Sequence, residues 1–261
     1  MRNKSAVIIV ILVFTMIWAS LAGAQDGSVR DLTQIIASRK LVVAMVDRDY
    51  PPYVLHGQDD QLSGMSVELA QDIANELSVT LEIVKTASFN DVIEKVAAGQ
   101  ADIGLPLIMT ISRAMKVNFT DAYRKFAIVL LLNRMKMAAN NLEAGMQHLD
   151  EIKNTTDTIG VIGHSAFEAA AIKHFPRAKV KTYDQFGDML QAAEKGEILL
   201  AIGNTGMSNA YLKENPHLMV KLQPFTIEGR FSHTAMAVGL KSDHLLSWLN
   251  AYLLVKGLSV R

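Results

Sequence analysis

A short run that ends in Arg113 has the residue types and the spacing of a site for a small carboxylate. Thr110-Ile111-Ser112-Arg113 follows an apolar segment at 101–105 that predicts a strand. A threonine after a strand is a good N-cap, which places Arg113 in the first turn of a helix, where unpaired amides favour anions. The forked guanidinium can hold a carboxylate through two parallel hydrogen bonds. We therefore predict that Arg113 anchors a carboxylate-bearing ligand; the alternative is a solvated arginine on a helix surface.

The run that ends in Arg113 must be positioned by its surroundings, in which short apolar strands alternate with helical patterns. Strands are expected at 41–46, 80–84, 102–105 and 127–132, and helices at 66–77 and 91–98. A second unit has expected strands at 158–162, 180–182 and 198–202 and helices at 165–174, 185–195 and 207–214, before a last strand at 234–240 and a last helix at 245–255. Residues 133–157 are polar and are predicted to be irregular. The alternation predicts an α/β fold of mostly parallel sheets flanked by helices, with ligands at the strand carboxyl ends.

Residues 1–24 have the pattern of an export signal. Arg2 and Lys4 precede an apolar run at 6–18, and small residues stand at 22–24. We expect cleavage after Ala24 and a periplasmic protein. An uncleaved membrane anchor is the alternative, because residues 6–24 are long enough to span a bilayer.

The composition narrows the classes of partner. After residue 24 the chain has 24 basic and 26 acidic residues, a net charge of −2, which argues against a nucleic-acid partner. There are no cysteines, and the seven histidines lack paired ligand spacing, so we predict no disulfide, metal site or cofactor. The chain is long enough for one large domain or two lobes.

Six motifs, in order, resemble those of the extracytoplasmic solute-binding proteins of the amino-acid type (family 3), the receptors of ABC importers. They lie at 47–53, 64–69, 89–93, 99–103, 110–113 and 119–123. The resemblance implies a type II periplasmic-binding-protein fold, in which two lobes joined by two hinge strands, expected near 129–132 and 221–225, close on a ligand. By this resemblance, residues 25–128 with 225–261 form lobe 1, and residues 129–224 form lobe 2. It also implies a monomer that delivers its ligand to a membrane permease.

The resemblance assigns roles at the carboxylate end of the ligand. Arg113 would grip the carboxylate, and Thr110 would contact it through its amide or hydroxyl. Ser165, in Gly163-His164-Ser165, matches the helix start through which lobe 2 reaches the same group.

Other positions would line the rest of the cleft. The rings of Tyr50 and Phe89 would sandwich the ligand, and Asp47 stands where the family has an acidic residue. Asn204 stands where the family has an aspartate that binds the ligand's α-ammonium, and an amide does not neutralise that charge. Pro106 also removes one backbone donor near the site. These departures leave open a carboxylate that carries no ammonium.

Two other functions stay open. Some proteins with this fold are dehydratases of prephenate-like acids, for which Asp47 is the general acid that the sequence offers. Another alternative is a partner that presents ligand state to a membrane sensor. We expect binding rather than catalysis, and the sequence does not separate transport from sensing.

Overall fold

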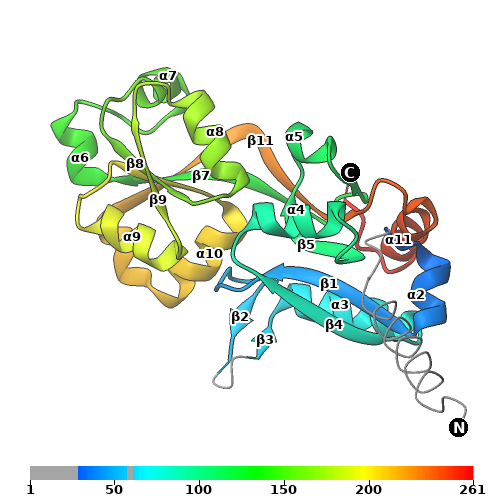
Figure 1. The fold of residues 1–261 in the computed structure, drawn as a ribbon. Coiled ribbons are helices and arrows are strands. Elements are labelled where there is room, and N and C mark those ends of the chain that lie inside the picture. The colour runs from blue at the N-terminus through cyan, green and yellow to red at the C-terminus, as the bar shows by residue number, and fades with distance from the viewer. Residues whose placement is uncertain (1–28, 58–60, 261) are drawn as a thin grey trace, which may run out of the picture.

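The computed structural model describes residues 29–57 and 61–260, so the predicted signal peptide at 1–24 lies outside the described residues. The described chain is an α/β protein in which two groups of helices and strands are joined by two long strands (Figure 1). Among the described residues, no helix is long and apolar enough to cross a membrane.

One group, which we call lobe 1, is built around the parallel strands β4, β1 and β5. The strands of lobe 1 are β1 (Lys40–Val46), β2 (Leu55–His56), β3 (Leu62–Ser63), β4 (Thr80–Thr86), β5 (Ile103–Ile108) and β6 (Asn118–Phe119). Its helices are α2 (Leu32–Ser38), α3 (Met65–Glu76), α4 (Phe89–Ala97), α5 (Ile111–Ala114) and α11 (Asp243–Val255). Burial of Ile73, Ala74 and Leu77 packs the apolar side of α3 and its C-cap onto this sheet.

The other group, lobe 2, is built around the parallel strands β10, β8 and β9. These strands are β8 (Thr158–Ile162), β9 (Lys179–Tyr183) and β10 (Leu200–Asn204). The helical segments are α6 (Arg134–Ala139), η1 (Met146–His148), α7 (Leu149–Lys153), α8 (Ala166–His174), α9 (Phe186–Glu194), α10 (Thr205–Glu214) and η2 (Pro216–Val220). Residues 159–162 of β8 are apolar and buried, and α8 and α9 pack against this strand.

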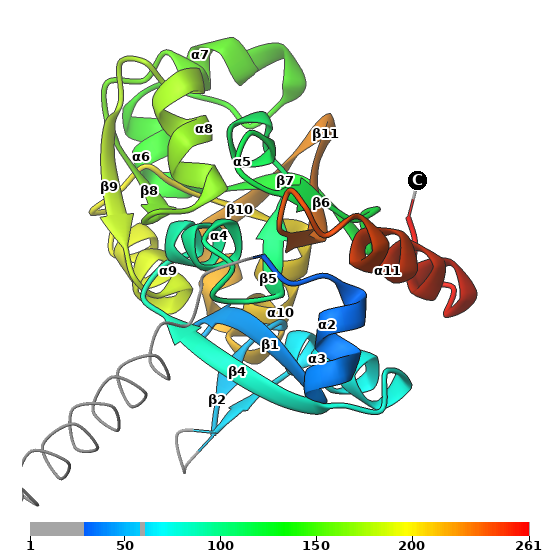
Figure 2. The same ribbon diagram turned by 45° about the vertical axis from the view of Figure 1, so that its right-hand side comes forward.

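Two long antiparallel strands connect the lobes. β7 (Arg124–Asn133) pairs with β10, and the end of β11 (Leu222–Val238) pairs with β5, while β7 and β11 pair with each other along most of their length. Figures 1 and 2 show them side by side as they pass between the lobes. The predicted boundaries at 128/129 and 224/225 fall inside these shared strands and stay a prediction.

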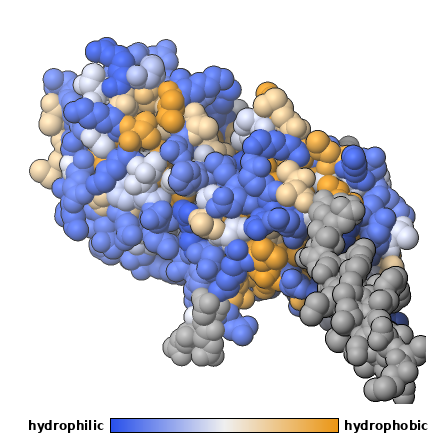
Figure 3. Space-filling model, in the orientation of Figure 1, coloured by the Kyte–Doolittle hydropathy of each residue, from blue (hydrophilic) through white to orange (hydrophobic). Residues whose placement is uncertain are grey.

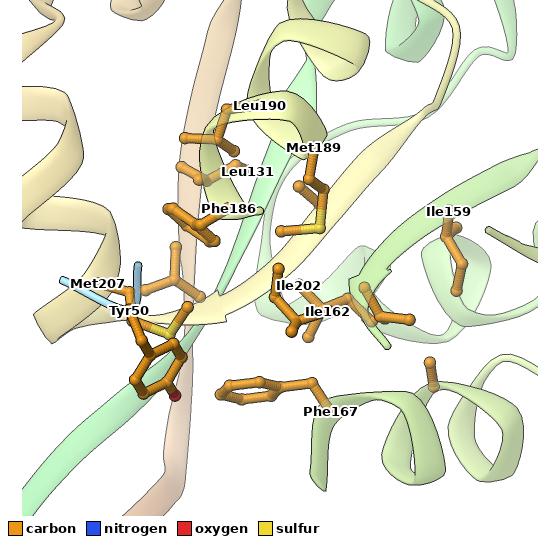
Figure 4. Close-up of a cluster of buried hydrophobic side chains, with 14 of the residues drawn as sticks. Tyr50, Leu131, Ile159, Ile162, Phe167, Phe186, Met189, Leu190, Ile202 and Met207 are labelled. Atoms are coloured by element: carbon orange, nitrogen blue, oxygen red, sulfur yellow. The ribbon is translucent and has the colours of Figure 1, made fainter. Parts of the chain in front are cut away.

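The lobes contact each other near the carboxyl ends of their parallel strands. One continuous apolar cluster contains residues of both lobes, including Tyr50 and Phe167, whose rings point toward each other (Figure 4). Nearby, the buried Arg48 donates a hydrogen bond from Nη1 to the carbonyl oxygen of Asp184 at 3.3 Å, and another from Nη2 to that of Ala87. Arg48 and Ala87 belong to lobe 1, and Asp184 follows β9 of lobe 2, so Arg48 bridges the two lobes.

Several predicted elements were wrong in extent or type. Residues 133–157 are only partly irregular: Asn133 caps α6 by accepting a hydrogen bond from the amide of Lys136, and η1 and α7 follow after a short irregular stretch. The hinge strand expected near 221–225 and the strand expected at 234–240 are parts of one strand, β11, and α2 was not predicted. Strand β5 does not stop at Leu105 but continues through Pro106 to Ile108. The ladder between β5 and β11 has an irregularity at this proline, which has no amide to donate.

Candidate ligand-binding site

The backbone around Arg113 has the predicted local structure. Thr110 is the N-cap of α5, and its Oγ1 accepts a hydrogen bond from the amide of Arg113 at 3.2 Å. The cap turns the chain out of β5, and the arginine side chain then lies back over the end of that strand. Its Nη1 donates to the carbonyl oxygen of Ile108 at 3.0 Å.

The guanidinium of Arg113 is buried without an acidic partner among the described residues. The residue is 7% exposed, and none of the described acidic side chains forms a salt bridge with it. Burial lowers its pKa to about 10 because water is removed from the charged group. The group stays protonated at neutral pH, and only one of its five N–H donors has a described acceptor.

A small cavity lies beside this charge, between the two lobes. Tyr50, Phe89, Pro106, Ile108, Arg113 and Thr234 line it from lobe 1 and strand β11, and Ser165 and Ala166 line it from lobe 2. Its volume is about 10 Å³, room for roughly one water molecule. A ligand as large as an amino acid therefore requires the lobes to separate before it enters.

The two predicted aromatic residues form an apolar wall. Tyr50 and Phe89 contact edge to face, with ring centroids 4.9 Å apart, and Tyr53 stacks on Tyr50 at 5.4 Å. Both predicted rings are about 5% exposed. Burial raises the pKa of the Tyr50 phenol, so it stays protonated, and none of the described residues hydrogen-bonds to its hydroxyl. This hydroxyl is an unused donor at the cavity.

Lobe 2 presents the start of a helix. Ser165 is the N-cap of α8, and its Oγ accepts hydrogen bonds from the amides of Phe167 and Glu168 at 3.2 and 3.3 Å. The same hydroxyl donates to the carbonyl oxygen of Ile162 at 2.6 Å. The positive end of the α8 dipole therefore faces the cavity that Arg113 lines.

A second cavity of about 250 Å³ adjoins the first at the rim. It is lined by Asn90, Thr110, Ser112, Arg113, Ser165, Ala166, Glu168, Ala169 and Ile172. Thus Thr110 lies at the rim rather than in the inner cavity. Figure 3 shows a largely hydrophilic face with hydrophobic residues exposed over α5, where Ile111 is 88% and Met115 is 74% exposed.

The structure does not bring Asp47 into the cavity with Arg113. Its Oδ1 hydrogen-bonds to Nε2 of His56 at 3.0 Å and pairs with Nζ of Lys85 at 3.3 Å. The bond to His56 is the main cause that lowers the pKa of Asp47, and it raises the pKa of His56. Asp47 lines a separate opening with Arg48 and Asp184.

Asn204 also lies outside the cavity. It is 1% exposed and caps α10, its Oδ1 accepting from the amide of Met207 at 3.0 Å. Its Nδ2 donates to the hydroxyl of Ser232 at 3.1 Å. Both functional atoms of this amide are therefore occupied within the protein.

Some lining residues were not predicted. Ile108 and Ala166 could have been inferred from the sequence, because each stands next to a predicted motif. Thr234 had a weaker signal, as a polar residue at the start of an apolar strand; it is buried, and its Oγ1 lies 3.4 Å from the hydroxyl of Tyr53.

Comparisons with known proteins agree with this architecture. Among curated proteins, the chain is 22% identical over 212 residues to the ABC transporter arginine-binding protein 1 of Escherichia coli, covering 78% of this chain and 80% of that protein. It is 24% identical over 178 residues to the virulence sensor protein BvgS of Bordetella bronchiseptica, covering 68% of this chain and 14% of the sensor.

Solved structures with the same fold include two binding proteins. The ancestral amino acid-binding protein AncCDT-1, a precursor of cyclohexadienyl dehydratase, has a TM-score of 0.72 and 22% identity, covering 87% of this chain and 92% of that one. A putative ABC transporter binding component from Wolinella succinogenes, complexed with lysine, also has a TM-score of 0.72 and 22% identity, covering 84% and 90%. The predicted two-lobed type II periplasmic-binding-protein fold is therefore confirmed.

The family is shown by a match that spans both lobes. Residues 42–253 match the model of the bacterial extracellular solute-binding proteins, family 3. This range contains every residue that lines the cavity at Arg113. The chain therefore belongs to the bacterial extracellular solute-binding proteins, family 3.

Proposed function

We propose that this chain is a periplasmic solute-binding protein that captures a small carboxylate-bearing solute, an amino acid or a related organic acid, between its closing lobes. The observation that carries the proposal is the guanidinium of Arg113, which is buried beside a cavity and has no described anionic partner. An unpaired charge in the interior is costly, and a ligand carboxylate would relieve that cost.

The surroundings of Arg113 support an anion of this type. The start of α8 adds a second positive element from the opposite lobe. The rings of Tyr50 and Phe89 offer an apolar contact for the rest of the ligand. In this proposal, a ligand carboxylate connects Arg113 of lobe 1 with the helix start of lobe 2, so binding favours closure of the lobes.

We further propose that the loaded protein delivers its ligand to the membrane permease of an ABC importer and acts as a monomer. The arginine-binding relative from Escherichia coli supports this role. Exposed apolar side chains from both lobes, Ile111 of α5 and Ile172 of α8, flank the rim and suit a partner that recognises the closed form. The similarity to part of the sensor BvgS favours the alternative, a partner that presents ligand state to a membrane sensor.

Catalysis is the less supported role. The ancestral neighbour is described as a precursor of a dehydratase, and such chemistry would need a general acid near the bound ligand. Asp47, the predicted candidate, is bonded to His56 and Lys85 and lines a different opening.

The binding proposal is tested by a thermal-shift screen of small carboxylic acids and amino acids, each compared with its methyl ester. The ester keeps the carbonyl group and the rest of the molecule and adds one methyl group, but it removes the negative charge. We expect at least one acid to raise the melting temperature, with its ester giving no shift. A screen in which esters match their acids would refute carboxylate recognition.

Delivery needs a separate test. Uptake of the radiolabelled acid found in the screen would be measured in cells with and without the gene. We expect uptake to fall without it; unchanged uptake, with binding intact, would favour sensing over transport.

A further inference from the structure

The cavity at Arg113 has positive groups but no described group that could neutralise a ligand's ammonium. Its polar side chains are Arg113, Ser165, Thr234 and the hydroxyl of Tyr50, and the remaining lining is apolar. Solved relatives of the same fold include one complexed with lysine, a ligand with ammonium groups. The question is therefore which acid of this chain could accept such a group.

Asp47 is the first candidate, and its carboxylate is occupied. It is held by His56 at 3.0 Å and by Lys85 at 3.3 Å, in an opening that does not include Arg113. To meet an ammonium in the inner cavity it would have to leave both partners.

Asn204 is the second candidate, and it is neutral as well as occupied. Its oxygen, the atom that could accept from an ammonium, caps the amide of Met207. With 1% exposure, it has no open side toward a ligand.

Glu168 is the third candidate and lines the rim cavity together with Arg113. It lines the rim cavity but not the inner one, and its Oε2 accepts a hydrogen bond from the amide of His164 at 2.5 Å. It is therefore committed to the start of α8, on the outer side of Arg113.

We propose that the site selects carboxylates that lack an α-ammonium group, such as unsubstituted, 2-hydroxy or 2-oxo acids, and discriminates against zwitterionic amino acids. This inference rests on the proposed function. An ammonium would join the guanidinium of Arg113 and the positive end of α8 in a buried space. The ligand's own carboxylate offsets only one of these positive groups, and none of the described residues that line the cavity adds a second carboxylate. A neutral substituent meets no such penalty, and the free hydroxyl of Tyr50 can donate to a hydroxyl or keto oxygen.

The test uses matched ligands that differ only at the α-carbon. Each of a panel of L-amino acids with aliphatic, aromatic, acidic and basic side chains is compared with its 2-oxo and its deaminated acid. Phenylalanine, phenylpyruvate and 3-phenylpropionate form one such set. Binding is measured by calorimetry at pH 7.5 on protein that has been unfolded in guanidinium, dialysed and refolded to remove any bound ligand.

We expect the tightest binder of the panel to lack the ammonium and to bind about tenfold or more tightly than its amino acid. An amino acid as the tightest binder would overturn the inference while leaving the proposed function intact. Absence of binding by every acid would instead refute the proposed function, and the inference with it.

A matched variant locates any ammonium partner. Glu168→Gln keeps the acceptor for His164 but removes the charge. We expect it to leave the ranking of the panel unchanged. If an amino acid binds, and Glu168→Gln weakens its binding but not that of its deaminated acid, Glu168 is the ammonium acceptor and the inference is wrong.

Discussion

Replacing Arg113 by methionine should stabilise the ligand-free protein and weaken ligand binding, two effects of opposite sign. Methionine has a similar length and no charge, so it fits the same space without the desolvation cost. The pKa of the guanidinium falls from 12.5 to about 10 through burial, which corresponds to a penalty of about 3 kcal/mol for holding the charge there.

Part of this gain is offset, because the variant loses the hydrogen bond to the carbonyl oxygen of Ile108, worth about 1 kcal/mol. We therefore expect the free energy of unfolding to rise by about 1–2 kcal/mol, or the melting temperature by about 2–8 °C for a chain of this size. The lost bidentate carboxylate contact should weaken binding by about 3 kcal/mol, or roughly a hundredfold.

Urea denaturation of ligand-free protein and calorimetry with the tightest acid would measure the two effects. Arg134→Met is the control, because Arg134 is exposed and bonded to the side chain of Gln223; we expect it to change each quantity by less than about 0.5 kcal/mol. Arg113→Lys, which keeps the charge without the fork, should bind with intermediate affinity. If Arg113→Met is less stable than the native protein while the control is unchanged, the claim that the buried charge of Arg113 is uncompensated is refuted. If Arg113→Met binds the acid with unchanged affinity, the proposed contact between Arg113 and the ligand is refuted.

Three further predictions concern the groups around the site. Ser165→Ala should lower the free energy of unfolding by about 1 kcal/mol, because it removes the cap of α8. It should also weaken ligand binding severalfold; a variant that loses stability but keeps full affinity would show that Ser165 has only a structural role. Asn204→Ala should lose about 1–2 kcal/mol of stability in urea titrations, whereas Asn204→Ser, whose hydroxyl can still accept from the capped amide without adding a charge, should lose less; equal losses would contradict the capping account. The raised pKa of His56 means that its bond to Asp47 contributes fully below the ordinary pKa of 6.5, and that this contribution disappears as pH rises through the raised value. The urea concentration at the unfolding midpoint should therefore be lower at pH 8 than at pH 6 in the native protein, and this difference should be smaller in His56→Gln. An equal difference in both proteins would exclude this linkage.

Local patterns predicted the parts of the site that depend on neighbouring residues. The capping of α5 by Thr110 is a contact over three residues, so its spacing is visible in the chain. The same holds for Ser165 at the start of α8. Both predictions required no knowledge of distant segments.

Where the structure places a predicted site residue outside the cavity at Arg113, partners that are distant in the sequence determine its position. Asp47 is turned aside by His56 and Lys85, and a periodic pattern does not reveal which carboxylate finds a cation. The short helix α6 was missed because its cap, Asn133, terminates an apolar strand and resembles the start of a loop. The continuity of β11 was missed because the side chains between the hinge strand expected near 221–225 and the strand expected from 234 are largely half-exposed or exposed, so this stretch lacks an apolar signal.

The bridge made by Arg48 has a consequence for selectivity. Its acceptors are the carbonyl oxygens of Ala87 and Asp184, groups of the protein that are present whichever solute is bound. With the proposed closure of the lobes, the bridge therefore shifts the population between open and closed forms by the same factor for every ligand, and apparent dissociation constants change in inverse proportion to the closed fraction. Arg48 thus sets how tightly the protein holds all of its ligands, while the ranking among them is left to the groups that touch them.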